Sequence, residues 1–168
     1  MGAILYILLA YITEFDRRSL EIPNGTIILG FIFGILLLTL NFYFIDNKLA
    51  IETLKSHLIA SLSIFLITLI LNITGECLTG VTLLGIGDSK LLSMGGLWIG
   101  IKGIYSALGL AFLIAGVYSL ISRLSGRLKL FDVIPFAPFI NGGIWIVWLV
   151  GPNFVWQKLQ TLFGALMV

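Results

Sequence analysis

The amino-acid sequence predicts an all-α fold: a polytopic transmembrane bundle of about six helices. Charged residues make up only 11% of the 168 residues, whereas a soluble domain carries about 25%. The hydrophobic fraction is 59% and the mean hydropathy is +1.11. Such a composition suits lipid rather than water as the surrounding solvent. We therefore expect a single membrane-embedded domain over residues 1–168, without a separate soluble domain.

The first predicted helix covers residues 2–15. This run is apolar, no basic residue precedes it, and Arg17 and Arg18 follow it. A secretory signal peptide has the opposite order, so we expect a retained segment with its N-terminus outside. About 14 residues at 1.5 Å each span roughly 21 Å, less than the roughly 30 Å of a hydrocarbon core. The polar residues that follow should therefore lie close to the membrane boundary.

Charged residues, or stretches with glycine and proline, separate five further apolar runs, each of which predicts a helix. A last apolar stretch, residues 155–168, is short and is expected to lie in the membrane interface or against the bundle. The five runs cover residues 25–45, 57–74, 83–100, 103–122 and 136–151.

The basic residues predict the orientation of the bundle, because cytoplasmic loops of membrane proteins are rich in Lys and Arg. With the N-terminus outside, the inner side carries more basic residues than the outer side. Asp16 and Asp88 then both lie at the cytoplasmic face, since two segments separate them. The inner residues are Arg17, Arg18, Lys90, Arg123, Arg127 and Lys129, and the outer ones are Lys48, Lys55, Lys102 and Lys158.

Several classes of site are disfavoured by composition. The chain has one cysteine, Cys77, and one histidine, His57, which excludes an internal disulfide and argues against a protein-built zinc site. The net charge of +2 is too small to indicate nucleic-acid binding. We expect no metal and no cofactor.

Asp88 follows two glycines in the stretch Gly85-Ile86-Gly87-Asp88-Ser89-Lys90. Acids at membrane depth are costly to bury and are functional candidates by default. The glycines allow a tight turn and the close approach of another segment, and the start of the fourth helix favours negative charge. In the simpler interpretation Asp88 is only an N-cap residue.

Asp16 supplies a possible partner for Asp88. Alone it belongs to a charged stretch that leads through a Pro-Asn turn into the second segment. Two carboxylates together can hydrolyse a peptide: one takes a proton from water, the other donates a proton to the carbonyl oxygen, and the pair shares one proton. Glu14 is a rival, but residues two apart on a helix point about 200° apart. Glu21, Glu76 and Asp132 are expected to be loop charges or partners of the inner basic residues.

The sequence contains three motifs, in the order Asp16-Arg17-Arg18 with Ile22-Pro23-Asn24, then Gly85-Ile86-Gly87-Asp88-Ser89-Lys90-Leu91-Leu92, and Ile134-Pro135-Phe136-Ala137-Pro138-Phe139. In this order they resemble the motifs of the type IV prepilin peptidases, and the resemblance covers about residues 10 to 145. The resemblance implies an aspartyl protease at the cytoplasmic membrane boundary, which removes the basic leader from prepilins, pseudopilins or archaellins. It implies that Asp16 and Asp88 are the catalytic pair and that Gly85 and Gly87 shape the Asp88 turn. Lys90, Pro23 and Asn24 match motif positions without an assigned role.

The sequence departs from that family in two respects. Larger bacterial members carry a cytoplasmic segment with paired CxxC motifs, associated with N-methylation of the new pilin terminus. With one cysteine and no such segment, this sequence is similar to small peptidase-only members, such as those of tight-adherence (Flp) pilus systems or archaea. Ser89 stands where many members carry a hydrophobic residue such as valine.

Two other functions remain open from the sequence. A small transporter could use Asp16 and Asp88 as an ion or proton site, although both acids fall at one face rather than at the midplane. A protease of the presenilin or signal-peptide-peptidase type would place the partner aspartate in a different motif on a longer chain. For a prepilin substrate, inner-face acids such as Glu21 and Glu76 could attract the basic leader.

Overall fold

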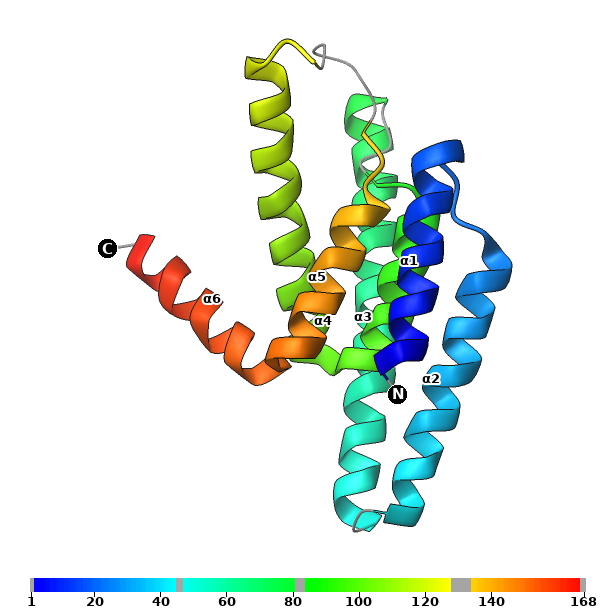
Figure 1. Ribbon diagram of the computed structural model, residues 1–168. Helices are drawn as coiled ribbons and strands as arrows, with labels where there is room; N and C mark the ends of the chain where they lie inside the picture. Colours follow the sequence, from blue (N-terminus) through cyan, green and yellow to red (C-terminus); the bar gives the residue numbers. More distant parts are fainter. Residues whose placement is uncertain (1, 45–46, 81–83, 128–133, 167–168) are drawn as a thin grey trace.

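The structure, a computed structural model, describes residues 2–44, 47–80, 84–127 and 134–166. Within these residues every regular element is an α-helix, as the sequence predicts. Lys129, assigned to the inner side above, and Asp132, expected to be a loop charge or a partner of the inner basic residues, lie outside the described residues. The helices are α1 (Gly2–Ser19), α2 (Asn24–Phe44), α3 (Asn47–Thr79), α4 (Ile86–Leu124), α5 (Ala137–Val150) and α6 (Pro152–Leu166), as Figure 1 shows.

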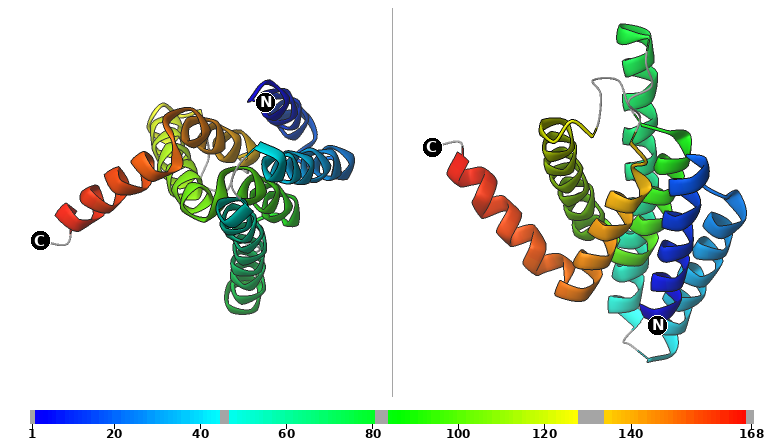
Figure 2. Two further views of the ribbon diagram at one scale, coloured as in Figure 1. Left: turned by 90° about the horizontal axis from the view of Figure 1, so that it is seen from below. Right: turned by 45° about the horizontal axis from the view of Figure 1, so that its top comes forward.

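Successive passes of the chain run in opposite directions along the long axis of the molecule (Figures 1 and 2). In Figure 1, α1 rises from the N-terminus, α2 descends and α3 rises again. The end of α1, the end of α3 and the start of α5 lie in the upper half of that view. This alternation places Asp16 and Asp88 at the same end of the bundle, because Asp88 lies in the first turn of α4, which begins shortly after α3 has ended.

Helix α4 is bent sharply at Gly100, whose backbone has φ +69° and ψ −177°. Both ends of α4 lie in the upper half of Figure 1, while its middle lies lower, so its two legs run in opposite directions. The bend lies where the sequence separates the runs 83–100 and 103–122. A positive φ suits glycine, and the bend leaves the Leu97 carbonyl facing α3, where Nδ1 of His57 lies 2.7 Å away.

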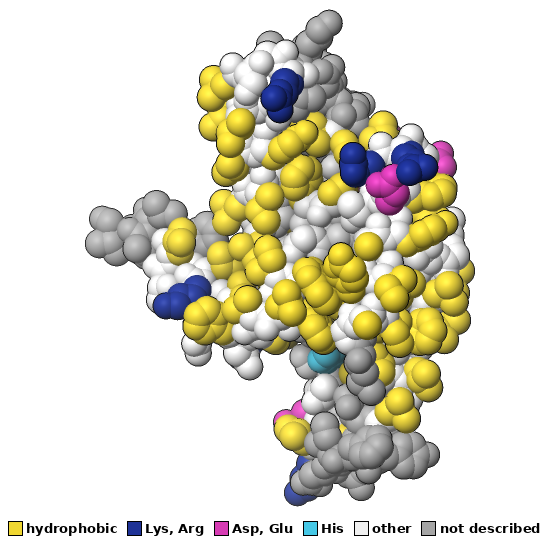
Figure 3. Space-filling view, in the orientation of Figure 1, with side chains coloured by type: hydrophobic (Ala, Val, Ile, Leu, Met, Phe, Trp, Pro, Cys, Tyr) yellow, Lys and Arg dark blue, Asp and Glu magenta, His cyan; other side chains and the backbone are white. Residues whose placement is uncertain are grey.

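Among the residues that the structure describes, two helices are long and apolar enough to cross a membrane: α3 over Lys48–Leu78 and α4 over Ile86–Leu124. The pair α5 and α6, bent by 110°, is a third candidate if it counts as one span, and α2 is apolar but shorter over Asn24–Leu40. In Figure 3 hydrophobic side chains cover much of the visible face, and most charged ones lie toward its upper and lower edges. The chain is a multi-pass membrane protein.

Helix α3 begins about ten residues before the predicted start of its apolar run. The segment that includes Glu52, Lys55 and His57 is helical, because an α-helix satisfies its own backbone groups and can continue from lipid into the polar interface. Charge therefore marks where the lipid ends rather than where the helix ends.

Turns of defined chemistry separate the helices at the upper end. Leu20, at φ +55°, ends α1 and its N–H donates to the carbonyl of Asp16 at 2.9 Å. Pro23 precedes α2, and its carbonyl accepts the N–H of Thr26 at 3.1 Å. A second proline, Pro138, lies in the first turn of α5, where a missing N–H costs nothing.

Small residues allow the helices to approach closely around α4. A Cβ atom added at Gly30 would meet the Met94 sulfur at 2.0 Å, and one at Gly96 would meet the backbone of Ser61 at 2.9 Å. Trp98 also donates its indole N–H to the Gly30 carbonyl at 3.0 Å. The first leg of α4 is thus the centre of the bundle, held between α2 and α3, and it carries Asp88 at its upper end.

Candidate active site

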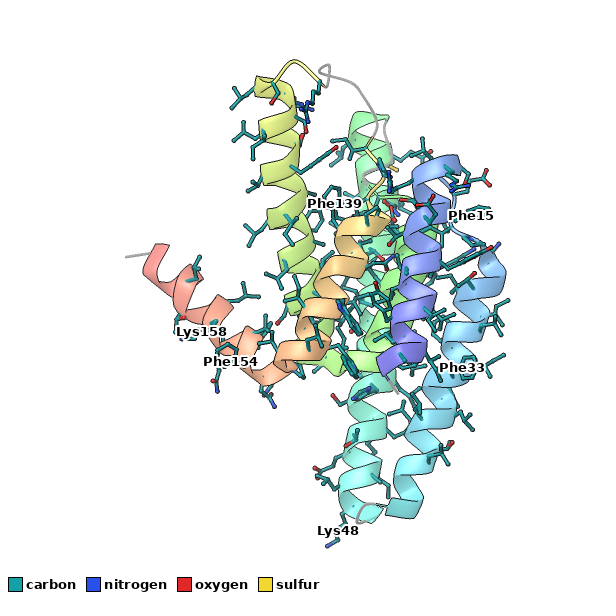
Figure 4. The ribbon with its side chains drawn as sticks, viewed as in Figure 1. Phe15, Phe33, Lys48, Phe139, Phe154 and Lys158 are labelled. Carbon is teal, nitrogen blue, oxygen red and sulfur yellow. The ribbon has the colours of Figure 1, made fainter. Side chains whose placement is uncertain are left out.

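Asp16 lies in the last turn of α1 and is only 5% exposed. Its Oδ2 accepts the backbone N–H of Ala137, the first residue of α5, at 3.2 Å. The N-terminal end of a helix has free N–H groups and a positive dipole end, which stabilise a carboxylate. Burial raises the pKa of the Asp16 carboxyl, and the Ala137 N–H opposes that rise. Figure 4 labels Phe15 and Phe139, which show the end of α1 beside the start of α5.

Asp88 lies in the first turn of α4, three residues after the N-cap, which is Gly85. The Asp88 carboxylate accepts a hydrogen bond from the Gly85 backbone, the return bond of a capping box. Asp88 is therefore not the N-cap residue that the simpler interpretation assumed. Because Gly85 has no side chain, it makes no side-chain capping hydrogen bond at the start of α4.

The two aspartates line one pocket of about 370 Å³ at the upper end of the bundle. They are close enough for the charge of Asp16 to act on the carboxyl of Asp88. Like charges at this range disfavour a doubly ionised pair and favour a shared proton. The pocket is lined by Asp16, Leu20, Glu21, Ile22, Asn24, Gly85, Ile86, Gly87, Asp88 and Lys90.

Both predicted glycines leave space that a side chain would occupy. A Cβ atom at Gly85 would lie 3.3 Å from Oδ2 of Asp88. One at Gly87 would lie 3.2 Å from the Cβ of Ile22, in the segment that connects α1 to α2. The first glycine makes room for the carboxylate, and the second lets the connecting segment close the pocket.

Of the three motif residues without an assigned role, Lys90 and Asn24 line the pocket, and Pro23 precedes Asn24 in the chain. Lys90 of α4 donates to Oδ1 of Asn24 at 2.9 Å and so ties the first turns of α2 and α4 together. Pro23 directly precedes α2, and its carbonyl accepts the backbone N–H groups of Thr26 and Ile27 in the first turn. The Lys90 ammonium is thereby held at the pocket by a neutral partner.

Of the other acids, Glu21 lines the pocket, whereas Glu14 and Glu76 do not. Glu14 is 51% exposed and pairs with Arg18 at 2.6 Å and with Arg17 at 3.6 Å, so its side chain is not among those that line the pocket with Asp16. Glu21, which the sequence analysis treated as a loop charge, lines the pocket. The reason is the left-handed turn at Leu20, which folds the connecting segment back over the site. Glu76 is exposed on α3 and does not line this pocket.

Three residues near the site were missed by sequence reasoning: Ala137, Asn72 and Asn141. Asn141 of α5 is 4% exposed, and its Nδ2 donates to the Leu9 carbonyl at 3.0 Å and to the Thr13 hydroxyl at 2.8 Å. Asn72 of α3 contacts the turn before Asp88. Each asparagine interrupts an apolar run, and that was the available signal. Ala137 acts through its backbone, which has no signature in side-chain chemistry.

The site has the groups for acid–base chemistry. Among the residues that the structure describes, no group of three His, Cys, Asp or Glu side chains could hold a metal ion. The Asp16 carboxyl is buried and the Asp88 carboxyl is half-buried. With a backbone donor on each, the two groups can exchange protons with a bound water and a substrate.

Comparison with known proteins gives one finding. The model of the type IV leader peptidase family matches residues 3–120, more than two thirds of the chain. The matched region contains both aspartates and all of the pocket-lining residues. No curated protein and no solved structure matches the chain.

Proposed function

Since the chain belongs to the type IV leader peptidase family and is a membrane peptidase, we propose that it is an aspartyl endopeptidase. Its catalytic pair is Asp16 and Asp88. Its substrates are type IV prepilin-like precursors, and it cleaves their basic leader at the cytoplasmic membrane boundary. The observation that carries this proposal is the convergence of the two aspartates on one pocket, from α1 and α4.

The pair would hydrolyse a peptide with one shared proton. The ionised carboxylate takes a proton from water while the water oxygen attacks the carbonyl carbon, and the protonated carboxyl donates to the carbonyl oxygen. The tetrahedral intermediate then breaks its C–N bond. The leaving nitrogen receives the proton that came from water, and the other carboxylate recovers its proton from the intermediate. Hydrogen bonds from Ala137 and Gly85 hold both carboxylates in place during this exchange.

The charges that line the pocket support a basic substrate. Asp16, Glu21 and Asp88 lie in its wall, and Lys90, held by Asn24, is the one basic residue among the described residues that line it. This excess of acid attracts a leader rich in Lys and Arg. A long apolar helix that follows the leader in a prepilin would lie in the lipid beside the bundle, which brings the junction between the two to the depth of the pocket.

The proposed orientation puts this end of the bundle in the cytoplasm. Arg17, Arg18, Lys90, Arg123 and Arg127 belong to helix ends and turns on the side of the pocket, and Lys48 lies at the opposite end in Figure 4. An excess of basic residues near cytoplasmic loops is the general rule for membrane proteins. The membrane would be the plasma membrane, where pilin-like precursors are inserted.

A reconstituted cleavage assay tests the proposal. Purified protein in proteoliposomes should convert a prepilin with a basic leader to the mature length, with a new N-terminus directly before its apolar helix. A precursor whose leader lysines are replaced by glutamate should be cleaved far more slowly. If prepilins, pseudopilins and archaellins all stay uncleaved while the vesicles show proton or cation flux that depends on Asp16 and Asp88, the transporter interpretation replaces the peptidase.

A further inference from the structure

A polar network holds the Asp88 turn, and its members Asn72, Leu84 and Ser89 are not among the residues that line the pocket. Its centre is Asn72 of α3, which is 5% exposed within an otherwise apolar stretch of a membrane span. Its Oδ1 accepts the backbone N–H of Leu84 at 2.7 Å, and its Nδ2 donates to the Ser89 hydroxyl at 3.4 Å. The Ser89 hydroxyl donates in turn to the Gly85 carbonyl at 3.4 Å.

The two hydrogen bonds of Asn72 reach residues on either side of Asp88 in the sequence. Leu84 comes directly before the N-cap of α4, and Ser89 comes directly after Asp88. The Leu84 N–H belongs to no helix and is buried, so without Asn72 it has no partner in the apolar interior. One side chain on a neighbouring helix thus fixes both ends of the turn from which the Asp88 carboxylate projects.

We propose that Asn72, acting through Leu84 and Ser89, is a positioning residue that holds the Asp88 turn in its productive geometry. The inference rests on the proposed role of Asp88. Asn72 does not line the pocket, so it acts on the reaction only through the backbone of the turn. Its loss should therefore lower kcat and leave the binding of the leader, which depends on pocket-lining groups, nearly unchanged.

The helix pair offers a matched control. Ser61 of α3 and Ser93 of α4 form a buried hydrogen bond at 3.0 Å between the same two helices, about one turn further along α4 from Ser89. Ser61→Ala removes a polar contact between α3 and α4 without touching the Asp88 turn. Ser89→Ala is a milder second variant, because it leaves the bond between Asn72 and the Leu84 N–H intact.

Cleavage of a prepilin by proteoliposomes is measured with Asn72→Leu, Ser89→Ala and Ser61→Ala. We expect Asn72→Leu to lower kcat by about tenfold or more, with less than about a twofold change in KM. Ser89→Ala should lower kcat by a smaller factor, and Ser61→Ala by less than about twofold. Equal kcat losses for Asn72→Leu and Ser61→Ala, or a loss confined to KM, would overturn the proposal.

Amide hydrogen exchange gives a readout that needs no substrate. Asn72→Leu should speed exchange in peptides that cover residues 84–89, while Ser61→Ala should leave those peptides at the wild-type rate. If the wild-type protein cleaves no prepilin, the proposed function fails, yet exchange still reports whether Asn72 holds the turn. Unchanged exchange in residues 84–89 of Asn72→Leu would contradict the inference, whatever the activity.

Discussion

The backbone N–H of Ala137 donates a hydrogen bond to Oδ2 of Asp16 across 121 residues of sequence. This contact places the start of α5 against the end of α1, and the free N–H groups of a helix start against a carboxylate. It links the proline-containing segment before α5 to the proposed catalytic pair. The Ala137 N–H can donate to an ionised or to a neutral side-chain oxygen. A substitution can therefore remove the charge of Asp16 and keep this hydrogen bond.

Replacing Asp16 by asparagine should stabilise the protein at neutral and alkaline pH. Asn keeps an oxygen for the Ala137 N–H but removes a buried charge that Asp88 also repels. Because burial raises the pKa of Asp16 above its ordinary 3.8, the wild type loses stability relative to Asp16→Asn as pH rises through the folded-state pKa. Below the ordinary pKa the Asp16 carboxyl is neutral in both the folded and the unfolded protein. The pH-dependent difference in stability between the wild type and Asp16→Asn should therefore vanish there.

Thermal unfolding in detergent at about pH 3 and pH 8 checks this sign. At pH 8, Asp16→Asn should melt a few degrees above the wild type, since about 1 kcal/mol moves the midpoint by roughly 2–4 °C in a chain of this size. Asp16→Ala, which leaves the Ala137 N–H without its acceptor, should melt below Asp16→Asn by an amount equivalent to about 1–3 kcal/mol. A wild type that melts above Asp16→Asn at pH 8 would show that the charge is stabilised rather than penalised.

Gly87→Ala should impair catalysis through one steric contact. The new Cβ atom would lie 3.2 Å from the Cβ of Ile22, and a β-branched side chain has little freedom to yield. The segment 20–23 would shift and open the pocket, with an expected loss of about tenfold in kcat/KM. Gly25→Ala is the control, because its Cβ would meet nothing within 4 Å. Equal activities of the two variants would disprove the close-packing role of Gly87.

Glu21 and Glu76 should differ in their effect on the basic leader. Glu21 lines the pocket and Glu76 does not. Glu21→Gln should therefore raise the KM for a leader rich in lysine by several-fold at low salt, with the difference shrinking as salt screens the attraction. Glu76→Gln should leave KM near the wild-type value. Cleavage rates measured against substrate concentration at two ionic strengths give the KM of each variant. An unchanged KM for Glu21→Gln would show that Glu21 does not bind the leader.

The large features of this fold were predictable because lipid imposes them. Apolar runs had to become helices, and the parity of the passes between Asp16 and Asp88 put both acids at one end. Gly100 marked the reversal within α4, since the sequence breaks its apolar pattern there. The spacing and order of the motifs also identified the residues that the structure gathers around the pocket: Asp16, Asn24, Gly85, Gly87, Asp88 and Lys90.

Other features depend on tertiary packing and left no local signal. The hydrogen bond from Ala137 to Asp16 uses a backbone N–H that every residue except proline possesses. No residue type at position 137 could therefore have predicted it. Glu21 reaches the pocket only because Leu20 adopts a left-handed turn, a conformation that leucine seldom takes. Asn72 and Asn141 could have been singled out as polar residues within apolar runs, but their partners on other helices could not.

The central claim is that Asp16 and Asp88 act as one catalytic pair. Prepilin cleavage in cells, followed by immunoblot together with membrane insertion, tests it for Asp16→Asn, Asp88→Asn and the control Glu14→Gln, whose side chain pairs with Arg18 outside the pocket. Each Asn variant should insert normally and lose at least about a thousandfold in cleavage rate, since the pair works as a unit, while Glu14→Gln should process the precursor. Processing retained by either Asn variant would contradict the account.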